Sequence, residues 1–226
     1  MTCQTNVVDS PIELWGLVFA ADLPDEPSHK TFFIRNQGHS GVLTFASALD
    51  AEIYCSQLAA TGMPGWRRAP LERIDLSRVM SLASPGERKI MLALGFHASD
   101  TNDLLADEDQ TLLTPLLPIP YRMTHSLHGL SQLHINHEVC DFIEQWWDRV
   151  GGDHYSEQVR MTSSWSDHEL ARCAGDALSK AAIMNMRQYH TLWSHSGAGD
   201  ECAVFSPGSG AWCFSTLQGP RQRALH

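Results

Sequence analysis

Among the residues that could carry out chemistry, the histidines of this chain have the spacing most similar to that of a metal-binding site. Two pairs share a spacing of three residues, namely His125 with His128 and His134 with His137. Imidazole rings three positions apart on a helix can bind one metal ion, so the cluster predicts a metal-dependent hydrolase as one candidate function. The pattern lacks the spacing of four and the internal glutamate of a zinc-protease helix, and Gly129 and Asn136 interrupt a regular helix. We therefore favour structural or surface histidines and keep the hydrolase as the alternative.

The sequence contains neither the serine-hydrolase motif nor a nucleotide-binding motif. The segments 38–41 and 194–197 contain serine beside histidine and glycine but not the Gly-x-Ser-x-Gly turn of a serine hydrolase. Neither glycine-rich nucleotide-binding pattern is present, so we expect no cofactor and assign no catalytic residues. Six cysteines are scattered without a Cys-x-x-Cys pair: Cys3, Cys55, Cys140, Cys173, Cys202 and Cys213. We interpret them as buried reduced thiols, while a cysteine nucleophile paired with one of the 12 histidines stays open.

An acidic segment supplies the candidate binding residues. With 26 acidic and 16 basic residues the chain has a net charge of −10, which opposes binding to nucleic acid or anionic membranes and favours a basic protein partner. The basic pair Arg67 and Arg68 beside Trp66 is interpreted as a solvated strand edge. The expected partner-binding residues are Asp103, Asp107, Glu108 and Asp109. The alternative for this segment is a solvated surface with no partner.

The elements of the first half predict an α+β fold. Apolar runs at 14–19, 31–35 and 42–45 predict a small antiparallel meander. Ser47 is a helix N-cap with Asp50 three residues later, and Gly62 ends that helix. A short helix at 76–83 follows its cap Asp75, and the apolar run 90–96 predicts a buried strand.

The second half is predicted to be mostly helical. One helix runs from the cap Asn136 to Gly151, and another runs from a capping box at Ser166 to about residue 186. A hairpin follows at 203–206 and 211–217. Three prolines between 115 and 120 place a boundary between two subdomains, 1–120 and 121–226. No run approaches the roughly 20 apolar residues of a membrane span, and residues 12–21 lack a signal peptide's basic start, so a cytoplasmic location is expected.

Residues 31–96 resemble the small α+β domains of the SseB and DUF2750-like kind. The matching stretches are 42–52, a strand with a Phe followed by a helix with an early Ala, and 71–76 after it. Domains of this kind occur among secretion-associated proteins and among bacterial immunity proteins of type VI and contact-dependent systems. The resemblance implies a cytoplasmic immunity protein that neutralises a toxin, most simply a nuclease effector, by occluding it.

Self-association is expected through the C-terminal half. Paired Trp146 and Trp147, the alanine-rich helix at 169–186, and Trp212 and Phe214 of the hairpin supply more apolar surface than about 100 residues bury readily. Two-fold symmetry is the common arrangement of such a pair. The expectation is a homodimer.

Overall fold

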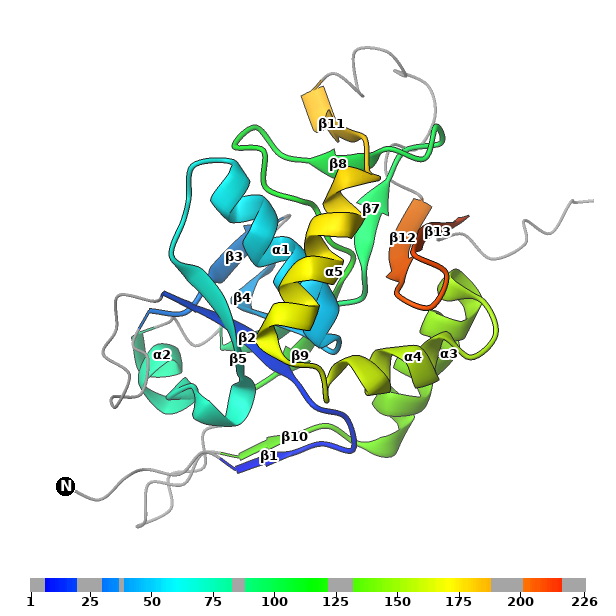
Figure 1. Cartoon of the computed structure of the whole chain (residues 1–226). Helices are drawn as coiled ribbons and strands as arrows, with labels where there is room; N and C mark the ends of the chain where they lie inside the picture. The colour runs from blue at the N-terminus through cyan, green and yellow to red at the C-terminus, as the bar shows by residue number, and fades with distance from the viewer. Residues whose placement is uncertain are drawn as a thin grey trace, which may run out of the picture.

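The computed structural model describes residues 7–19, 30–36, 39–82, 88–121, 132–187 and 201–216. In these ranges the chain forms five α-helices and thirteen strands, which are arranged in three sheets (Figure 1). The predicted α+β class is confirmed. No helix within these ranges has the length and apolar character needed to cross a bilayer.

The largest sheet is built mainly from the first half of the chain. Its strands are β2 (Trp15–Phe19), β3 (Phe33–Asn36), β4 (His39–Phe45), β5 (Trp66–Pro70), β6 (Lys89–Ala93) and β9 (Leu116–Pro120). The order is β5-β2-β4-β6-β9, and β3 also pairs with β4. The strands expected at 14–19, 31–35 and 42–45 are confirmed, and β2 and β3 are both antiparallel to β4. The sheet is larger than a meander and mixed, because β6 runs parallel to β4.

Helical segments connect the parallel strands β4 and β6. Helix α1 (Ala48–Ala60) begins at Ser47, whose hydroxyl accepts a hydrogen bond from the Asp50 amide at 3.1 Å. After β5 come a short 3-10 turn η1 (Leu71–Arg73) and helix α2 (Leu76–Leu82). The Asp75 carboxylate accepts from the Arg78 amide at 3.0 Å, so both predicted caps are present.

The second sheet has the order β11-β8-β7-β12-β13. Its strands are β7 (Phe96–Ala98), β8 (Leu104–Ala106), β11 (Ile183–Asn185), β12 (Glu201–Ser206) and β13 (Ala211–Thr216). The expected single strand at 90–96 is divided between the two sheets, which corrects that prediction. The chain bends at Gly95, whose φ is +97°, and a Cβ there would lie 2.7 Å from the Ala203 carbonyl oxygen. The predicted C-terminal hairpin is confirmed as β12 and β13.

Three helices follow the two-stranded parallel ribbon of β1 (Val7–Asp9) and β10 (Gln132–His134). They are α3 (His137–Gly151), α4 (Tyr155–Thr162) and α5 (Asp167–Ser179), and α4 was not expected from the sequence. The Asn136 cap and the Ser166 capping box are both present. Helix α5 ends well before residue 186, because residues 183–185 pair with β8 as strand β11.

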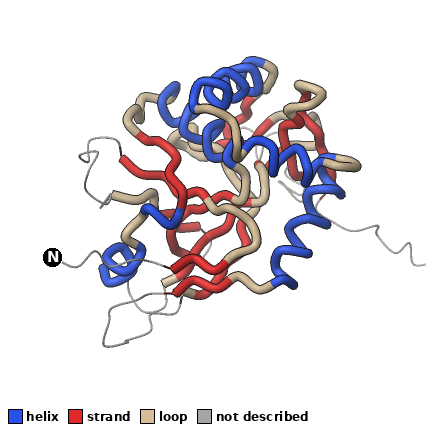
Figure 2. The backbone as a smooth tube through the Cα atoms, turned by 60° about the horizontal axis from the view of Figure 1, so that its bottom comes forward, coloured by secondary structure: helices blue, strands red, loops and turns tan. Residues whose placement is uncertain are grey.

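Two buried clusters make up the core, and helices lie around the strands (Figure 2). The first cluster includes Leu92, Trp147 and Val204, and the second includes Phe45 and Phe205 among its members. Each cluster therefore combines residues from the two expected subdomains, 1–120 and 121–226. The second sheet combines them as well, since β7 and β8 come from the first segment and β11, β12 and β13 from the second.

Candidate partner-binding surface

Strand β8 lies between two tight turns that carry the predicted binding residues. In the first turn the Ser99 hydroxyl accepts hydrogen bonds from the Thr101 amide at 3.2 Å and the Asp103 amide at 3.1 Å. The Thr101 hydroxyl donates to the Asp103 carboxylate at 2.6 Å. Asn102 takes the left-handed conformation with φ of 65°, which Asn adopts more readily than most residues. Asp103 is half-buried as a residue, and its carboxylate takes part in forming the turn.

The second turn is formed around Asp107. Its carboxylate accepts hydrogen bonds from the Asp109 amide at 3.0 Å and from the Thr111 amide at 2.8 Å. An aspartate that bonds the amides following it in this way mimics one turn of backbone. The Asp107 carbonyl also accepts from the Asn185 side chain at 2.7 Å, which ties the turn to β11. Asp107 therefore has a structural role whether or not it also contacts a partner.

Further carboxylates lie beside these two turns. Glu108 is exposed and forms an ion pair of 2.6 Å with Arg187, while Asp109 is exposed at the tip of the second turn. Glu201 pairs with Ala98 next to the first turn, and its pKa is raised by partial burial and then by the charge of Asp100. We call this group the acidic edge; its members are Asp100, Asp103, Asp107, Glu108, Asp109 and Glu201.

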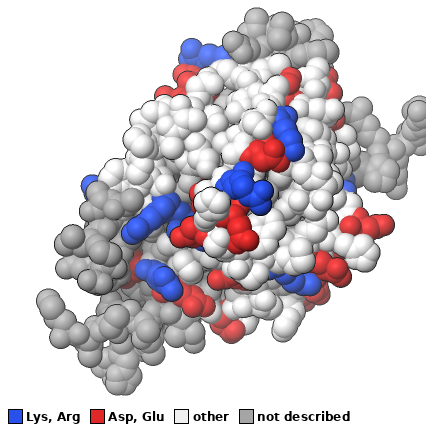
Figure 3. Space-filling model, in the orientation of Figure 1, with Lys and Arg blue, Asp and Glu red and all other residues white. Residues whose placement is uncertain are grey.

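The acidic edge can present carboxylate oxygens to basic side chains of a partner. Strand β8 has three residues, so its two turns are roughly 10 Å apart, a separation that one protein surface can cover. Figure 3 shows acidic and basic side chains interspersed over the face that α5 covers. The face drawn in Figure 3 is therefore not uniformly acidic.

The basic residue Arg68 is committed to contacts within the chain. Its guanidinium pairs with Glu52 at 3.3 Å and with Asp167, and it lies over the Trp15 ring with 4.7 Å to the centroid. Only 10% of the Arg68 side chain is exposed. Strand β5, which contains Arg68, forms an edge of the large sheet as expected. The predicted solvation of the basic pair is wrong for Arg68, and only Arg67 is exposed. Arg68 therefore connects β5 to α1 and α5 and is poorly placed to bind phosphate.

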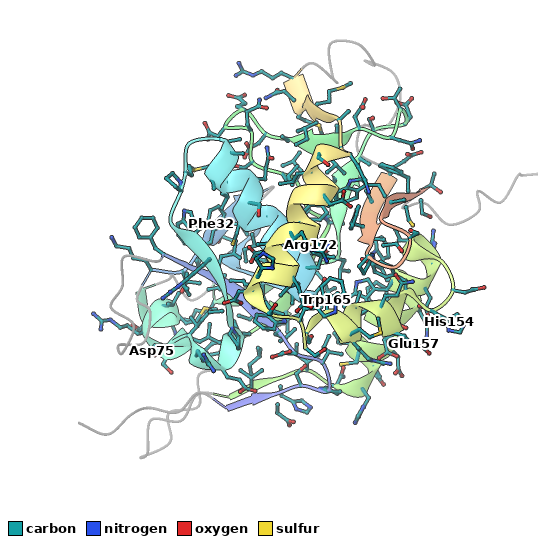
Figure 4. All side chains as sticks on the ribbon, viewed as in Figure 1. Phe32, Asp75, His154, Glu157, Trp165 and Arg172 are labelled. Carbon is teal, nitrogen blue, oxygen red and sulfur yellow. The ribbon has the colours of Figure 1, made fainter. Side chains whose placement is uncertain are left out.

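The predicted histidine site is described only in part. His134 lies at the end of β10, where its Nδ1 is 2.8 Å from the Asp9 carboxylate across the ribbon, and both side chains are exposed. His137 begins α3, and His125 and His128 lie outside the described residues. Elsewhere His154 contacts Glu157 at 3.5 Å at the start of α4 (Figure 4). The described parts of the chain contain no group of three or more ligands placed to hold a metal ion.

The cysteines whose surroundings are described are unsuited to nucleophilic chemistry. Burial raises the pKa of the Cys55 and Cys202 thiols to about 12. Burial is also the main cause of the raised pKa of Cys140, Cys173 and Cys213. The thiolate is the reactive form, so these five side chains are predominantly unreactive thiols at neutral pH.

The large apolar residues expected to drive dimerisation are buried or half-buried within the chain. Trp147 is 2% exposed, and the indole N–H of Trp146 donates to the Leu94 carbonyl at 2.9 Å. Trp212 donates to the Ala177 carbonyl at 2.9 Å, and Ala177 itself is fully buried on α5. The homodimer stays a prediction, but these side chains no longer supply its reason.

Sequence reasoning missed a buried carboxyl group, Asp50, in the first turn of α1. The residue is 2% exposed, and burial raises its pKa to about 7. Its Oδ1 has no hydrogen-bond partner within the described ranges. Its charge contributes to the raised pKa values of Tyr155 and Cys202, so these groups lie near it in the core. In the sequence, Asp50 stands three residues after the N-cap Ser47, where an acidic residue is common and usually exposed. Nothing in this local pattern predicts its burial.

Comparison with known proteins found no family model, curated protein or solved structure that matches this chain.

Proposed function

We propose that this chain is a cytoplasmic immunity protein that binds a bacterial toxin with a basic surface and neutralises it by occlusion. The observation that carries the proposal is the acidic edge, where exposed Asp100, Glu108 and Asp109 lie at the two ends of β8 on a chain of net charge −10. The resemblance of residues 31–96 to SseB and DUF2750-like domains supports the same role.

A nuclease effector of a type VI or contact-dependent secretion system is the toxin class that fits this chemistry. A nuclease binds phosphate groups, so its cleft is basic, and carboxylates placed where phosphates would sit can block that cleft. Long-range attraction between opposite charges also accelerates the encounter of the two proteins. Inhibition by occlusion requires no catalytic group in the inhibitor.

Co-expression with the toxin encoded beside this gene tests the proposal. The chain is expected to restore growth, and the two purified proteins are expected to elute together. Rescue of growth without a stable complex would contradict neutralisation by occlusion.

A charge-reversal variant tests whether the acidic edge is the contact. Asp100→Lys, Glu108→Lys and Asp109→Lys together should slow association with the toxin at low salt by roughly tenfold or more and weaken the salt dependence of the rate. These side chains are exposed, so the melting temperature should barely change. Asp103 and Asp107 are left intact because their carboxylates form the turns.

The matched control reverses three exposed carboxylates elsewhere, Glu72→Lys, Asp141→Lys and Asp153→Lys, and changes the net charge by the same amount. Stopped-flow association rates across a range of salt concentrations compare the two variants. If both variants bind equally fast, only the overall charge matters and the acidic edge is not the contact.

A further inference from the structure

A small pocket opens between the segment that joins β1 to β2 and the turn η1. Its volume is about 210 Å³, and the residues that line it, at 8, 10–14 and 70–72, all lie within the described ranges. Sites for cofactors and drug-sized molecules are usually larger, from about 300 Å³ upwards. The pocket is therefore better suited to a single side chain than to a cofactor.

Hydrogen bonds within the chain hold the walls of this pocket in place. The Ser10 hydroxyl donates to the Ile12 carbonyl at 2.7 Å and accepts from the Ile12 amide at 3.3 Å. The Leu71 amide donates to the Leu14 carbonyl at 2.8 Å, which joins η1 to the residues that precede β2. Strand β1 also contacts η1. The walls are thus positioned by the fold itself and need no ligand to form.

The lining combines an apolar wall with two carboxylates. Ile12, Leu14 and Leu71 are buried, with at most 9% of each residue exposed. Glu13 and Glu72 are exposed, and within the described part of the chain neither side chain forms a hydrogen bond or an ion pair. The two residues come from separate segments, Glu13 from the residues before β2 and Glu72 from η1. The pocket therefore presents two negative charges beside an apolar surface.

We propose that this pocket binds an arginine side chain of a partner protein. A guanidinium group presents five N–H donors in one plane, and its hydrogen bonds to carboxylates are among the strongest in proteins. The methylene groups of an arginine pack on apolar surface while the charged end stays beside carboxylates and water. The described residues hold no group of three or more metal ligands, and carboxylates repel anions, so a metal ion or a phosphate fits this pocket less well.

The pocket lies far from the acidic edge. Figure 1 shows β1 and β10 at the bottom of the molecule and β8 and β11 at the top. A partner that covers the two turns around β8 therefore does not fill the pocket through the same contact. The pocket is a second binding site, and the proposal does not rest on the neutralisation of a toxin.

Titration of the isotope-labelled full chain with a blocked arginine, N-acetyl-arginine methylamide, tests the proposal by nuclear magnetic resonance. The amide signals of Glu13, Leu14 and Glu72 should shift and saturate with a dissociation constant of about a millimolar, as expected for a ligand of this size. The citrulline analogue has nearly the same shape but no charge, so it should bind at least roughly tenfold more weakly. The lysine analogue should also bind more weakly, because an ammonium group lacks the planar fork of donors.

A variant with Glu13→Gln and Glu72→Gln removes both carboxylates at exposed positions, and its affinity for the arginine probe should fall at least roughly tenfold. The matched control, Glu138→Gln with Asp141→Asn, makes the same change of net charge at exposed positions on α3 and should bind as the wild type does. The amide spectra of both variants show whether each is folded.

Four outcomes would each overturn the proposal: no saturable shift at the pocket, equal binding of the citrulline analogue, tighter binding of the lysine analogue, or full affinity in the glutamine variant. The first three are measured on the wild-type chain, so they do not depend on the folding of a variant. None of these measurements involves a toxin, so their outcome is independent of the proposed function.

Discussion

At the scale of single residues, Asp50 is a carboxyl group whose surroundings in the fold differ from those expected at the start of a helix. The third residue of a helix is a favourable place for a carboxylate, because it faces the positive end of the helix dipole. Here the side chain is 2% exposed, and burial disfavours the charged form strongly enough to raise the pKa to about 7. Asp50 is therefore largely protonated in the folded chain at mildly acidic pH.

This burial predicts that stability falls as the pH rises. The pKa of Asp50 is raised from 3.8 to about 7, so between these values the folded chain keeps a proton that the unfolded chain releases. The Asp50→Asn variant cannot ionise, and it should be more stable than the wild type by a few kcal/mol at pH 8 and nearly equal to it at pH 4. Urea unfolding at both pH values measures this. An equal stability difference at both would show that Asp50 is not the titrating group.

At the scale of elements, the bend between β6 and β7 allows one apolar run to serve two sheets. Gly95 provides the bend with a positive φ, in close approach to β12. Any other residue at this position would adopt an unfavourable positive φ, and its Cβ would lie too close to the Ala203 carbonyl oxygen. The two turns around β8 also depend on particular residues, since the side chains of Ser99 and Asp107 accept hydrogen bonds from backbone amides there. These side chains therefore have a structural role in addition to any contact with a partner.

Substitution of Gly95 tests how tightly the two sheets are joined. Gly95→Ala should lower the free energy of unfolding by roughly 1–3 kcal/mol, because the residue takes a φ of +97° and its Cβ would lie 2.7 Å from a carbonyl oxygen. Gly175→Ala is the control, since that position lies inside α5 with open space around it, and it should gain roughly 0.5–1 kcal/mol. Denaturant titrations of the two variants should therefore shift in opposite directions.

At the scale of the whole molecule, the two halves of the sequence share their cores. The first cluster places Leu92 and Trp147 together, and the second places Phe45 together with Phe205. Helices α1 and α5, which come from different halves, also pack against each other. An isolated piece covering residues 1–120 would expose apolar surface that the second half covers.

This arrangement predicts a single cooperative unfolding transition. Circular dichroism reports the helices of both halves, and fluorescence reports tryptophans in both, from Trp15 to Trp212. The two signals should change at the same urea concentration, because loss of either half exposes both cores. Two separated transitions would show that residues 1–120 and 121–226 fold as independent units.

The sequence by itself determined the features that depend on neighbouring residues. The caps Ser47, Asn136 and Ser166 act on amides three positions ahead, and the terminal hairpin turns within residues 207–210. The tertiary structure decided what depends on distant partners. Residues 183–185 form a strand only because β8 lies beside them, and Asp50 changes its pKa only because other elements cover it. Pairing and burial of this kind are set by contacts tens of residues apart, which local patterns do not encode.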